Sequence, residues 1–250
     1  MQTTRLEPPS GLTIFHRGPS LDNGALPAFI YFALSGSESL ELDPYNQCVK
    51  FLEQYQIRIF SFSLPGHPIG ADHRHGMAQW SAGLLQSADY LEEFLHQAVE
   101  NIDYLISRGL IDINQISTGG LSRGGFIATH LAARHNHIRT VLGFSPLTAL
   151  RCLHEFDQLP QDFLDQINLE KQIPLLIGKS IRYYIGNRDM RVGTKTCFDF
   201  MQKLTEASFS SGIRSPNCEL TIYPSIGHKG HGTPPNIFND GANWIKYTPN

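Results

Sequence analysis

The sequence predicts an α/β domain in which a mostly parallel sheet lies between two layers of helices. Short, dense runs of apolar residues recur along the chain and are bounded by turn residues. Segments with helical spacing of apolar residues lie between these runs, and no repeat, low-complexity tract or linker divides the 250 residues. Because strands that alternate with helices pair in parallel and are covered on both faces, we expect one domain over residues 1–250.

Six apolar runs are the strand candidates, and a short run at 12–15 is a candidate edge strand. The six runs are 28–34, 57–64, 113–118, 140–144, 181–185 and 218–223. The clearest helix lies between the second and third runs, where apolar residues from Leu91 to Ile106 recur every three or four positions and stop at Gly109. Ligands bind at the carboxyl ends of the strands in open sheets of this kind, so functional residues are expected there.

Residues 146–179 form the longest stretch between two strand candidates, and their apolar side chains show no strand alternation. One interpretation is a small helical cap over a pocket at the carboxyl edge of the sheet. The other interpretation is an ordinary crossover helix followed by a long loop. The sequence supports both interpretations equally.

Charge and composition argue against several classes of function. The chain has 20 basic and 23 acidic side chains, a net charge of −3 and no run of Lys or Arg, so no nucleic-acid partner is expected. No window reaches the roughly 18 consecutive apolar residues of a membrane span, and the first residues lack the apolar core of a signal peptide. The four cysteines are far apart and form no CxxC motif. We therefore expect a cytoplasmic protein with reduced cysteines and no membrane partner.

The segment Gly119-Gly120-Leu121-Ser122-Arg123-Gly124-Gly125 contains the pattern G-x-S-x-G, centred on Ser122. The pattern follows the strand candidate 113–118 and precedes a helical run from Phe126, which is the context that holds a serine on a strained, exposed turn. A phosphate-binding loop is excluded because Gly125 stands where that motif requires lysine. Ser122 is therefore predicted to be a nucleophile.

A serine hydroxyl needs an adjacent base, and the base needs an anion that orients it. Asp189 lies in the loop that follows the strand candidate 181–185, and His228 and His231 lie in the loop that follows 218–223. Parallel strands bring such loops to one edge of the sheet, so Ser122, Asp189 and one of the two histidines are expected to meet.

On these residues the chain resembles the α/β-hydrolase superfamily over nearly its whole length. It is similar to the compact branch that contains dienelactone hydrolases and the catalytic domains of prolyl-oligopeptidase-like enzymes. The resemblance covers the serine turn 120–124, the acid loop 186–192 and the histidine loop 223–228. It implies a catalytic triad of Ser122, Asp189 and His228, because family histidines follow the last strand by a few residues. His231 is then a second histidine that shapes the loop or faces the substrate.

The resemblance also implies an oxyanion hole formed by the backbone N–H groups of Arg123 and Ser37. The family's His-Gly motif would fall at Ser35-Gly36, so this chain has serine where histidine is usual. The loop from Leu64 to His67 is similar to another family loop, with Ser63 in place of its leading acid, and is expected to be structural.

Together these features predict a cofactor-free serine hydrolase that cleaves carboxylic esters of small acyl substrates through an acyl-enzyme. Thioester hydrolysis and acyl transfer would use the same triad and stay open. A non-catalytic binding protein with the same fold is the alternative from another class. A peptidase of the prolyl-oligopeptidase type is not favoured, because only about 110 residues precede the strand that leads to Ser122, too few for a propeller.

A metal site is considered at Asp72, His73 and His75, because carboxylate and imidazole groups suit zinc. Metallohydrolase sites of this kind need a further histidine two positions before the aspartate, where this chain has Gly70. An exposed polar loop without metal is therefore expected.

Overall fold

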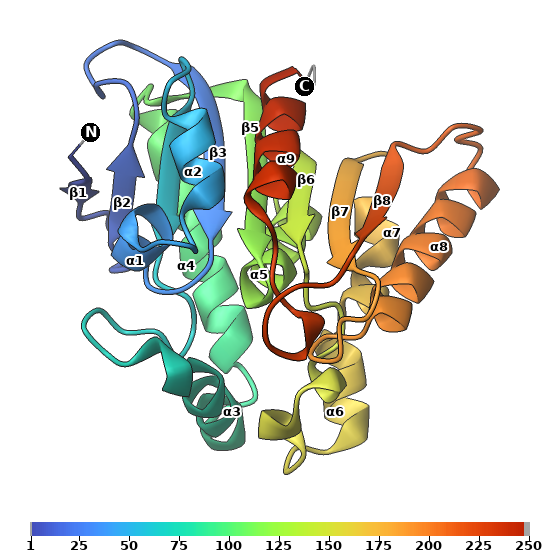
Figure 1. The fold of residues 1–250 in the computed structure, drawn as a ribbon. Coiled ribbons are helices and arrows are strands. Elements are labelled where there is room, and N and C mark those ends of the chain that lie inside the picture. The colour runs from blue at the N-terminus through green and yellow to red at the C-terminus, as the bar shows by residue number, and fades with distance from the viewer. Residues whose placement is uncertain (1, 248–250) are drawn as a thin grey trace.

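An eight-stranded sheet forms the centre of the protein in the computed structural model, which describes residues 2–247 (Figure 1). The strands lie in the order β1-β2-β4-β3-β5-β6-β7-β8. Their bounds are β1 Thr4–Leu6, β2 Ile14–Arg17, β3 Leu26–Phe32, β4 Arg58–Phe62, β5 Ile111–Leu121, β6 Ile138–Phe144, β7 Ser180–Gly186 and β8 Cys218–Tyr223. The pairs β1–β2 and β2–β4 are antiparallel and all other pairs are parallel. The predicted mostly parallel sheet is confirmed; residue 1 and residues 248–250 of the predicted domain lie outside the described part.

The central strands are apolar on both faces because each face is covered by helices. In β3, Phe29 and Tyr31 pack into the core on one side of the sheet, and Ile30 and Phe32 pack into the core on the other. All four side chains are fully buried. This double burial explains why the strands appear in the sequence as continuous apolar runs rather than as alternating patterns.

The helices form one layer on each side of the sheet. The helices are α1 Gly36–Glu41, α2 Gln47–Leu52, α3 Gly76–Gln86, α4 Tyr90–Ser107, α5 Arg123–Arg134, α6 Gln161–Ile167, α7 Ile173–Leu176, α8 Thr194–Ser210 and α9 Pro235–Tyr247. The core on one face takes side chains from α1, α2 and α9, including Leu40, Val49 and Phe238. The larger core on the other face takes side chains from α3, α4, α5, α7 and α8.

Helix α4 shows how the apolar spacing becomes packing. Leu91, Leu95, Ala98 and Ile102 lie on one face of this helix and are buried against the sheet. Two glutamates lie in its first turn, where the helix dipole favours them, and the chain leaves the helix through Gly109 with φ of 64°. Among residues 2–247, no helix is long and apolar enough to cross a bilayer.

Residues 146–179 contain α6, α7 and three short 3₁₀ helices, η2 Leu150–Cys152, η3 His154–Phe156 and η4 Leu169–Gln172. Figure 1 shows α6 beyond the carboxyl ends of the parallel strands, across from α3. Leu150, Phe156 and Leu169 are buried in the larger core. The segment is thus fixed to the domain by its own apolar side chains.

Candidate active site

Ser122 lies between the end of β5 and the first residue of α5, with φ of 56° and ψ of −115°. A positive φ is uncommon for a residue with a side chain. Hydrogen bonds hold the backbone on both sides: Ser122 N–H donates to Phe144 O at 2.8 Å, and Leu147 N–H donates to Ser122 O at 3.0 Å. The turn therefore stays in its strained conformation and exposes the hydroxyl at the carboxyl edge of the sheet.

The glycines on either side of Ser122 are required by close backbone packing. A Cβ atom at Gly124 would lie 1.9 Å from the carbonyl oxygen of Phe32, and one at Gly120 would lie 2.3 Å from the carbonyl carbon of Gly124. Real Cβ atoms do not approach backbone atoms this closely, so a side chain at either position would push α5 away from the sheet. The pattern G-x-S-x-G thus describes a steric constraint on this turn.

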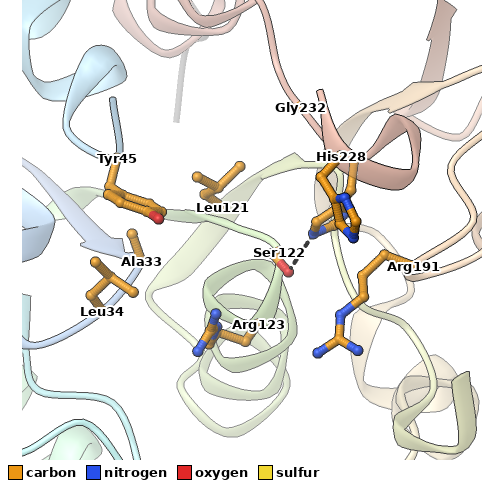
Figure 2. Close-up of a pocket in the computed structure, with 10 residues that line it drawn as sticks. Ala33, Leu34, Tyr45, Leu121, Ser122, Arg123, Arg191, His228 and Gly232 are labelled. Atoms are coloured by element: carbon orange, nitrogen blue, oxygen red, sulfur yellow. Dashed lines mark hydrogen bonds between the residues drawn. The ribbon is translucent and has the colours of Figure 1, made fainter. Parts of the chain in front are cut away.

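The hydroxyl of Ser122 is the first member of a continuous hydrogen-bond chain. Ser122 Oγ lies 2.8 Å from His231 Nε2, and His231 Nδ1 lies 2.7 Å from Asp189 Oδ2 (dashed line to Ser122 in Figure 2). Because an ionised carboxylate only accepts, Nδ1 carries the ring proton and Nε2 is free to accept the hydroxyl proton of Ser122. This is the arrangement in which a histidine can act as a general base toward a serine.

Asp189 is held in place from several directions. Its side chain is fully buried, and its Oδ1 accepts the N–H groups of Arg191 at 2.9 Å and Val192 at 3.0 Å. Its own N–H donates to Thr194 Oγ1 at 2.9 Å. Both carboxylate oxygens are thus satisfied, one by the loop backbone and one by His231, which fixes the orientation of the imidazole.

The prediction that His228 occupies the base position is wrong in this structure, because His231 makes both hydrogen bonds. His228 lies in the short 3₁₀ turn η5 His228–Gly230 and is exposed. The chain reverses around this turn: Ile226 pairs with Gly232 in an antiparallel bridge, and Gly227, Lys229 and Gly230 all have positive φ. This reversal adds three residues between β8 and the histidine that faces Ser122.

The histidine loop takes this shape because it docks on the acid loop. Met190 N–H donates to Lys229 O at 2.8 Å, and Arg188 N–H donates to Ser225 Oγ at 2.7 Å. The packing is tightest at Gly230, where a Cβ atom would lie 2.2 Å from Arg188 O. The position of His231 therefore depends on contacts between two loops that are about forty residues apart in sequence.

Of the two predicted oxyanion donors, Arg123 lies at the nucleophile, whereas Ser37 lies outside the described lining of the pocket. Arg123 is the first residue of α5, so its N–H has no acceptor within the helix and lies directly after Ser122. Ser37 belongs to α1, which begins with a capping box between Ser35 and Glu38, and it is not among the described residues that line the pocket at Ser122. Leu34 lines the pocket instead, although its N–H donates to Ser39 Oγ at 2.9 Å.

A pocket of about 290 Å³ opens at Ser122. Figure 2 shows its lining residues around the serine, with the Tyr45 hydroxyl and the guanidinium groups of Arg123 and Arg191 directed into the space beside it. The ten lining residues are Ala33, Leu34, Tyr45, Leu121, Ser122, Arg123, Arg191, His228, His231 and Gly232. The volume lies at the lower end of the range for small-molecule sites, which fits a small ligand.

The Arg123 side chain is anchored by His67. Arg123 Nη1 lies 2.5 Å from His67 Nε2, and His67 Nδ1 lies 2.8 Å from the carbonyl oxygen of Pro65. Since a carbonyl only accepts, Nδ1 carries the proton and Nε2 accepts from the guanidinium. Burial and the neighbouring Arg123 cation lower the pKa of His67 to about 4, so the imidazole is neutral at pH 7. The 64–67 loop was predicted to be structural; it also positions a side chain of the pocket.

Arg191 is paired with Glu155, which lies in η3. Burial acts most strongly on the Glu155 carboxyl and opposes its charge, but hydrogen bonds from Arg191 and from the backbone, together with the electrostatic effect of Arg191 and His154, outweigh burial and lower the pKa of this carboxyl. Residues 146–179 therefore reach the site through Glu155, although none of these described residues lines the pocket itself.

Asp72 binds Arg74 through three side-chain contacts, and His73 lies beside Tyr45 in an edge-to-face ring contact. His75 is exposed. Within residues 2–247, no group of three His, Cys, Asp or Glu side chains is arranged to hold a metal ion.

Sequence reasoning missed Tyr45, Arg191 and His67 as neighbours of the nucleophile. Arg191 lies two residues after Asp189, so the acid loop could have been searched for it. Tyr45 lies between α1 and α2 and carries no recognisable motif. Its place at the pocket depends on how these helices pack on the sheet.

Comparison of this structure with solved structures identifies its fold. TT1662 from Thermus thermophilus superposes with a TM-score of 0.70 at 16% identity, over 98% of this chain and 97% of that chain. Est1E from Butyrivibrio proteoclasticus, solved with ferulic acid bound, gives 0.68 at 13% identity over 97% of both chains. A putative dipeptidyl aminopeptidase IV from Bacteroides ovatus gives 0.71 at 16% identity, and this chain spans only 35% of its length.

No protein-family model and no curated protein sequence matches the chain. The fold is therefore recognised from the three-dimensional structure and from the order of the strands in the sheet that leads to Ser122. Overall sequence similarity does not identify it. The strand–turn–helix at Ser122, the acid loop after β7 and the histidine loop after β8 lie at one edge of this sheet. The chain has the α/β-hydrolase fold.

Proposed function

We propose that the protein is a serine hydrolase that cleaves carboxylic esters of small acyl substrates, with Ser122 as nucleophile, His231 as general base and Asp189 as the residue that orients His231. The observation that carries the proposal is the unbroken chain from Ser122 Oγ to Asp189 through His231, with distances of 2.8 and 2.7 Å. The strained turn at Ser122 and the pocket that opens on it support the same function.

In the proposed mechanism, Ser122 Oγ attacks the ester carbonyl carbon while its proton passes to His231 Nε2. The buried Asp189 carboxylate stabilises the imidazolium that forms. The tetrahedral intermediate collapses as His231 returns the proton to the leaving alkoxide, which departs as the alcohol. Water then loses a proton to His231 and attacks the acyl-enzyme, which releases the carboxylic acid and restores Ser122.

The negative charge on the carbonyl oxygen needs hydrogen-bond donors at the transition state. The N–H of Arg123 is the first donor, because it follows the nucleophile and has no helical acceptor. We propose the Tyr45 hydroxyl as the second donor, in place of Ser37. Tyr45 lines the pocket, and among residues 2–247 its hydroxyl makes only a long contact of 3.4 Å with His73 Nε2, whereas the N–H of Leu34 is already bound by Ser39.

Esters are favoured as substrates on two grounds. The pocket is small, and the Est1E structure of the same fold was solved with ferulic acid, a carboxylic acid, bound. Thioester hydrolysis and acyl transfer use the same groups and differ in the leaving group or in the acceptor that replaces water. The proposed acceptor is water. A small panel of esters, thioesters and amides with one common acyl group tests this ranking.

The decisive experiment compares wild-type protein with Ser122→Ala. Wild type should be labelled stoichiometrically by a fluorophosphonate and should hydrolyse 4-nitrophenyl esters. Ser122→Ala should lose labelling and lose turnover by roughly 10⁴–10⁶-fold, as triad losses do in other serine hydrolases. Its thermal unfolding should stay close to wild type, because only a hydroxyl is removed. A folded wild-type protein that is neither labelled nor active would leave the non-catalytic binding protein as the better description.

A further inference from the structure

The pocket wall beside Ser122 carries two guanidinium groups and no carboxylate. Of the described residues that line the pocket, Arg123 and Arg191 are charged and none is Asp or Glu. Figure 2 shows both guanidinium groups below Ser122 in this view, that of Arg123 on one flank and that of Arg191 on the other, beneath His228. The two cations are near enough for Arg191 to contribute to lowering the pKa of Arg123. Two like charges at one wall of a small pocket need a counter-charge, and the lining residues do not supply one.

Arg123 is the less compensated of the two cations. Its side-chain hydrogen bond within the described chain goes to His67, a neutral imidazole that accepts through Nε2. Burial lowers the pKa of Arg123 only to about 10, so the guanidinium remains charged at neutral pH. The chain therefore holds a partly buried cation beside the nucleophile and fixes its direction through His67. Most of its five N–H donors have no partner in the described part of the chain.

The position of His67 is itself tightly fixed. A Cβ atom at Gly76 would lie 2.0 Å from His67 Nε2, so the first residue of α3 packs directly on the imidazole ring. His67 is 3% exposed. The imidazole is thus a positioning residue for Arg123, held by its own hydrogen bond to Pro65 and by the backbone of α3.

Arg191 has a partner but retains spare donors. Its Nη1 and Nη2 donate to the two oxygens of Glu155, and Nη1 also contacts His154 Nδ1 at 3.4 Å, which leaves the Nε–H and one hydrogen on Nη2. The side chain of Arg191 is 22% exposed, so these donors can reach a ligand in the pocket. The charges of Arg123, Arg191 and Glu155 add up to one positive charge at this wall. Asp189 lies behind His231 with its carboxylate buried and fully hydrogen-bonded.

We propose that Arg123 and Arg191 form an anion subsite, and that the substrates are small esters that carry a second, ionised carboxyl group, such as monoesters of dicarboxylic acids. This inference rests on the proposed ester hydrolysis and adds the charge of the substrate to it. The planar carboxylate fits guanidinium donors in a bidentate geometry, and its single charge matches the single uncompensated positive charge of the wall. The small pocket sets a limit on the chain between the carboxylate and the ester.

The test compares charged and neutral esters of the same length. The probes are mono-4-nitrophenyl esters of the straight-chain diacids from succinic to suberic acid, and the same compounds with the free carboxyl group methylated. Spontaneous hydrolysis is subtracted, because the shorter monoesters cleave themselves. Wild type should favour the charged member of at least one pair by about tenfold or more in kcat/KM, the effect expected of one charge-assisted hydrogen bond.

Variants of the two arginines show which side chain causes the preference for charged esters. Arg123→Gln keeps the backbone N–H that serves the oxyanion, and it should reduce the charged-to-neutral ratio by about tenfold or more. Arg191→Gln should reduce the ratio by a smaller factor, and Arg123→Lys should retain part of it because the charge remains. Arg188→Gln is the matched control: it removes the same charge from an exposed site in the acid loop that does not line the pocket. Its ratio should stay within about twofold of wild type.

A binding measurement separates this inference from the proposed function. In Ser122→Ala, calorimetry with the monomethyl esters of the same diacids should detect binding of at least one of them, and adding Arg123→Gln should weaken that binding by about tenfold or more. Binding of this kind, together with a wild type that hydrolyses no ester, would overturn the hydrolase and keep the anion subsite. Ser122-dependent hydrolysis with equal kcat/KM for charged and neutral esters, unaltered by Arg123→Gln, would overturn the anion subsite and keep the hydrolase.

Discussion

The loops that follow β5 and β8 both carry a residue of the proposed triad, but their shapes have different origins. The turn at Ser122 is set locally, by two glycines and by its own strand and helix. The loop that carries His231 is set by its partner, because its reversal at residues 226–232 rests on the acid loop. A sequence motif can therefore specify the first loop and not the second.

The difference explains where the sequence-based prediction was wrong. Steric limits at Gly120 and Gly124 act over a few residues and leave a recognisable pattern. The contact between Gly230 and Arg188 joins segments that are far apart in sequence and leaves none. The number of residues after β8 therefore favoured His228 in the prediction. In the structure, the reversal of the chain brings His231 to Ser122 instead.

The largest expected effect separates the two histidines. His231→Ala should lower kcat by roughly 10⁴–10⁶-fold on an activated ester, because the hydroxyl of Ser122 would have no base. Fluorophosphonate labelling should fall with it, while the melting temperature should change little because the ring is partly exposed. A labelled and active His231→Ala protein would show that the loop adopts another shape in solution.

The acid loop is tested next. Asp189→Asn keeps the size of the side chain but offers an N–H or a weaker acceptor to His231 Nδ1, so the imidazole would favour the wrong tautomer. Turnover should fall by about 10⁴-fold with a nearly unchanged fold. Asp240, a carboxylate in α9 that binds Tyr184, provides the matched control, and Asp240→Asn should retain activity. Similar activity in the two variants would remove Asp189 from the triad.

Much of the fold could be predicted because it follows from burial. The strand that leads to Ser122 was expected at 113–118 and runs from Ile111 to Leu121, and β8 has the bounds that were predicted. The three-residue strand β1 escaped prediction, since it is a polar edge strand without an apolar run. The capping box of Ser35 and Glu38 was present in the sequence, yet this turn was interpreted as an oxyanion loop, which led to Ser37.

The two proposed oxyanion donors differ in the same way as the two loops. The N–H of Arg123 belongs to the turn at Ser122, whereas the hydroxyl of Tyr45 comes from a segment far from this turn in the sequence. Tyr45→Phe should lower kcat by roughly 10²-fold with little change in KM, since one transition-state donor is lost. Labelling by a fluorophosphonate should become slower but remain complete. Tyr55→Phe, which changes a tyrosine outside the pocket, is the control. A kcat within about twofold of wild type would show that the Tyr45 hydroxyl is not the second donor.

Gly230→Ala tests whether docking between loops places His231. The new Cβ would meet Arg188 O at 2.2 Å, and φ of 73° adds the cost of a left-handed residue, so the free energy of unfolding should fall by about 2–4 kcal/mol. Turnover should fall by about tenfold or more as His231 shifts relative to Ser122. Gly212→Ala is the control, because Gly212 has φ of 91° but no atom within 4 Å of the new Cβ. It carries the backbone strain without the clash and should keep full activity.

The smallest effect is expected at His228, the residue that the sequence favoured. His228 lines the pocket and is exposed, and the hydrogen bonds to Ser122 and Asp189 belong to His231. Loss of its ring should therefore change KM by a few-fold, through contacts with the substrate, and leave kcat within about threefold of wild type. Stopped-flow acylation and fluorophosphonate labelling rates measure the chemical step directly and should match those of wild type. If His228→Ala instead slows acylation by orders of magnitude while His231→Ala does not, the reversal at 226–232 is absent from the active enzyme, and the shape of this loop is specified locally after all.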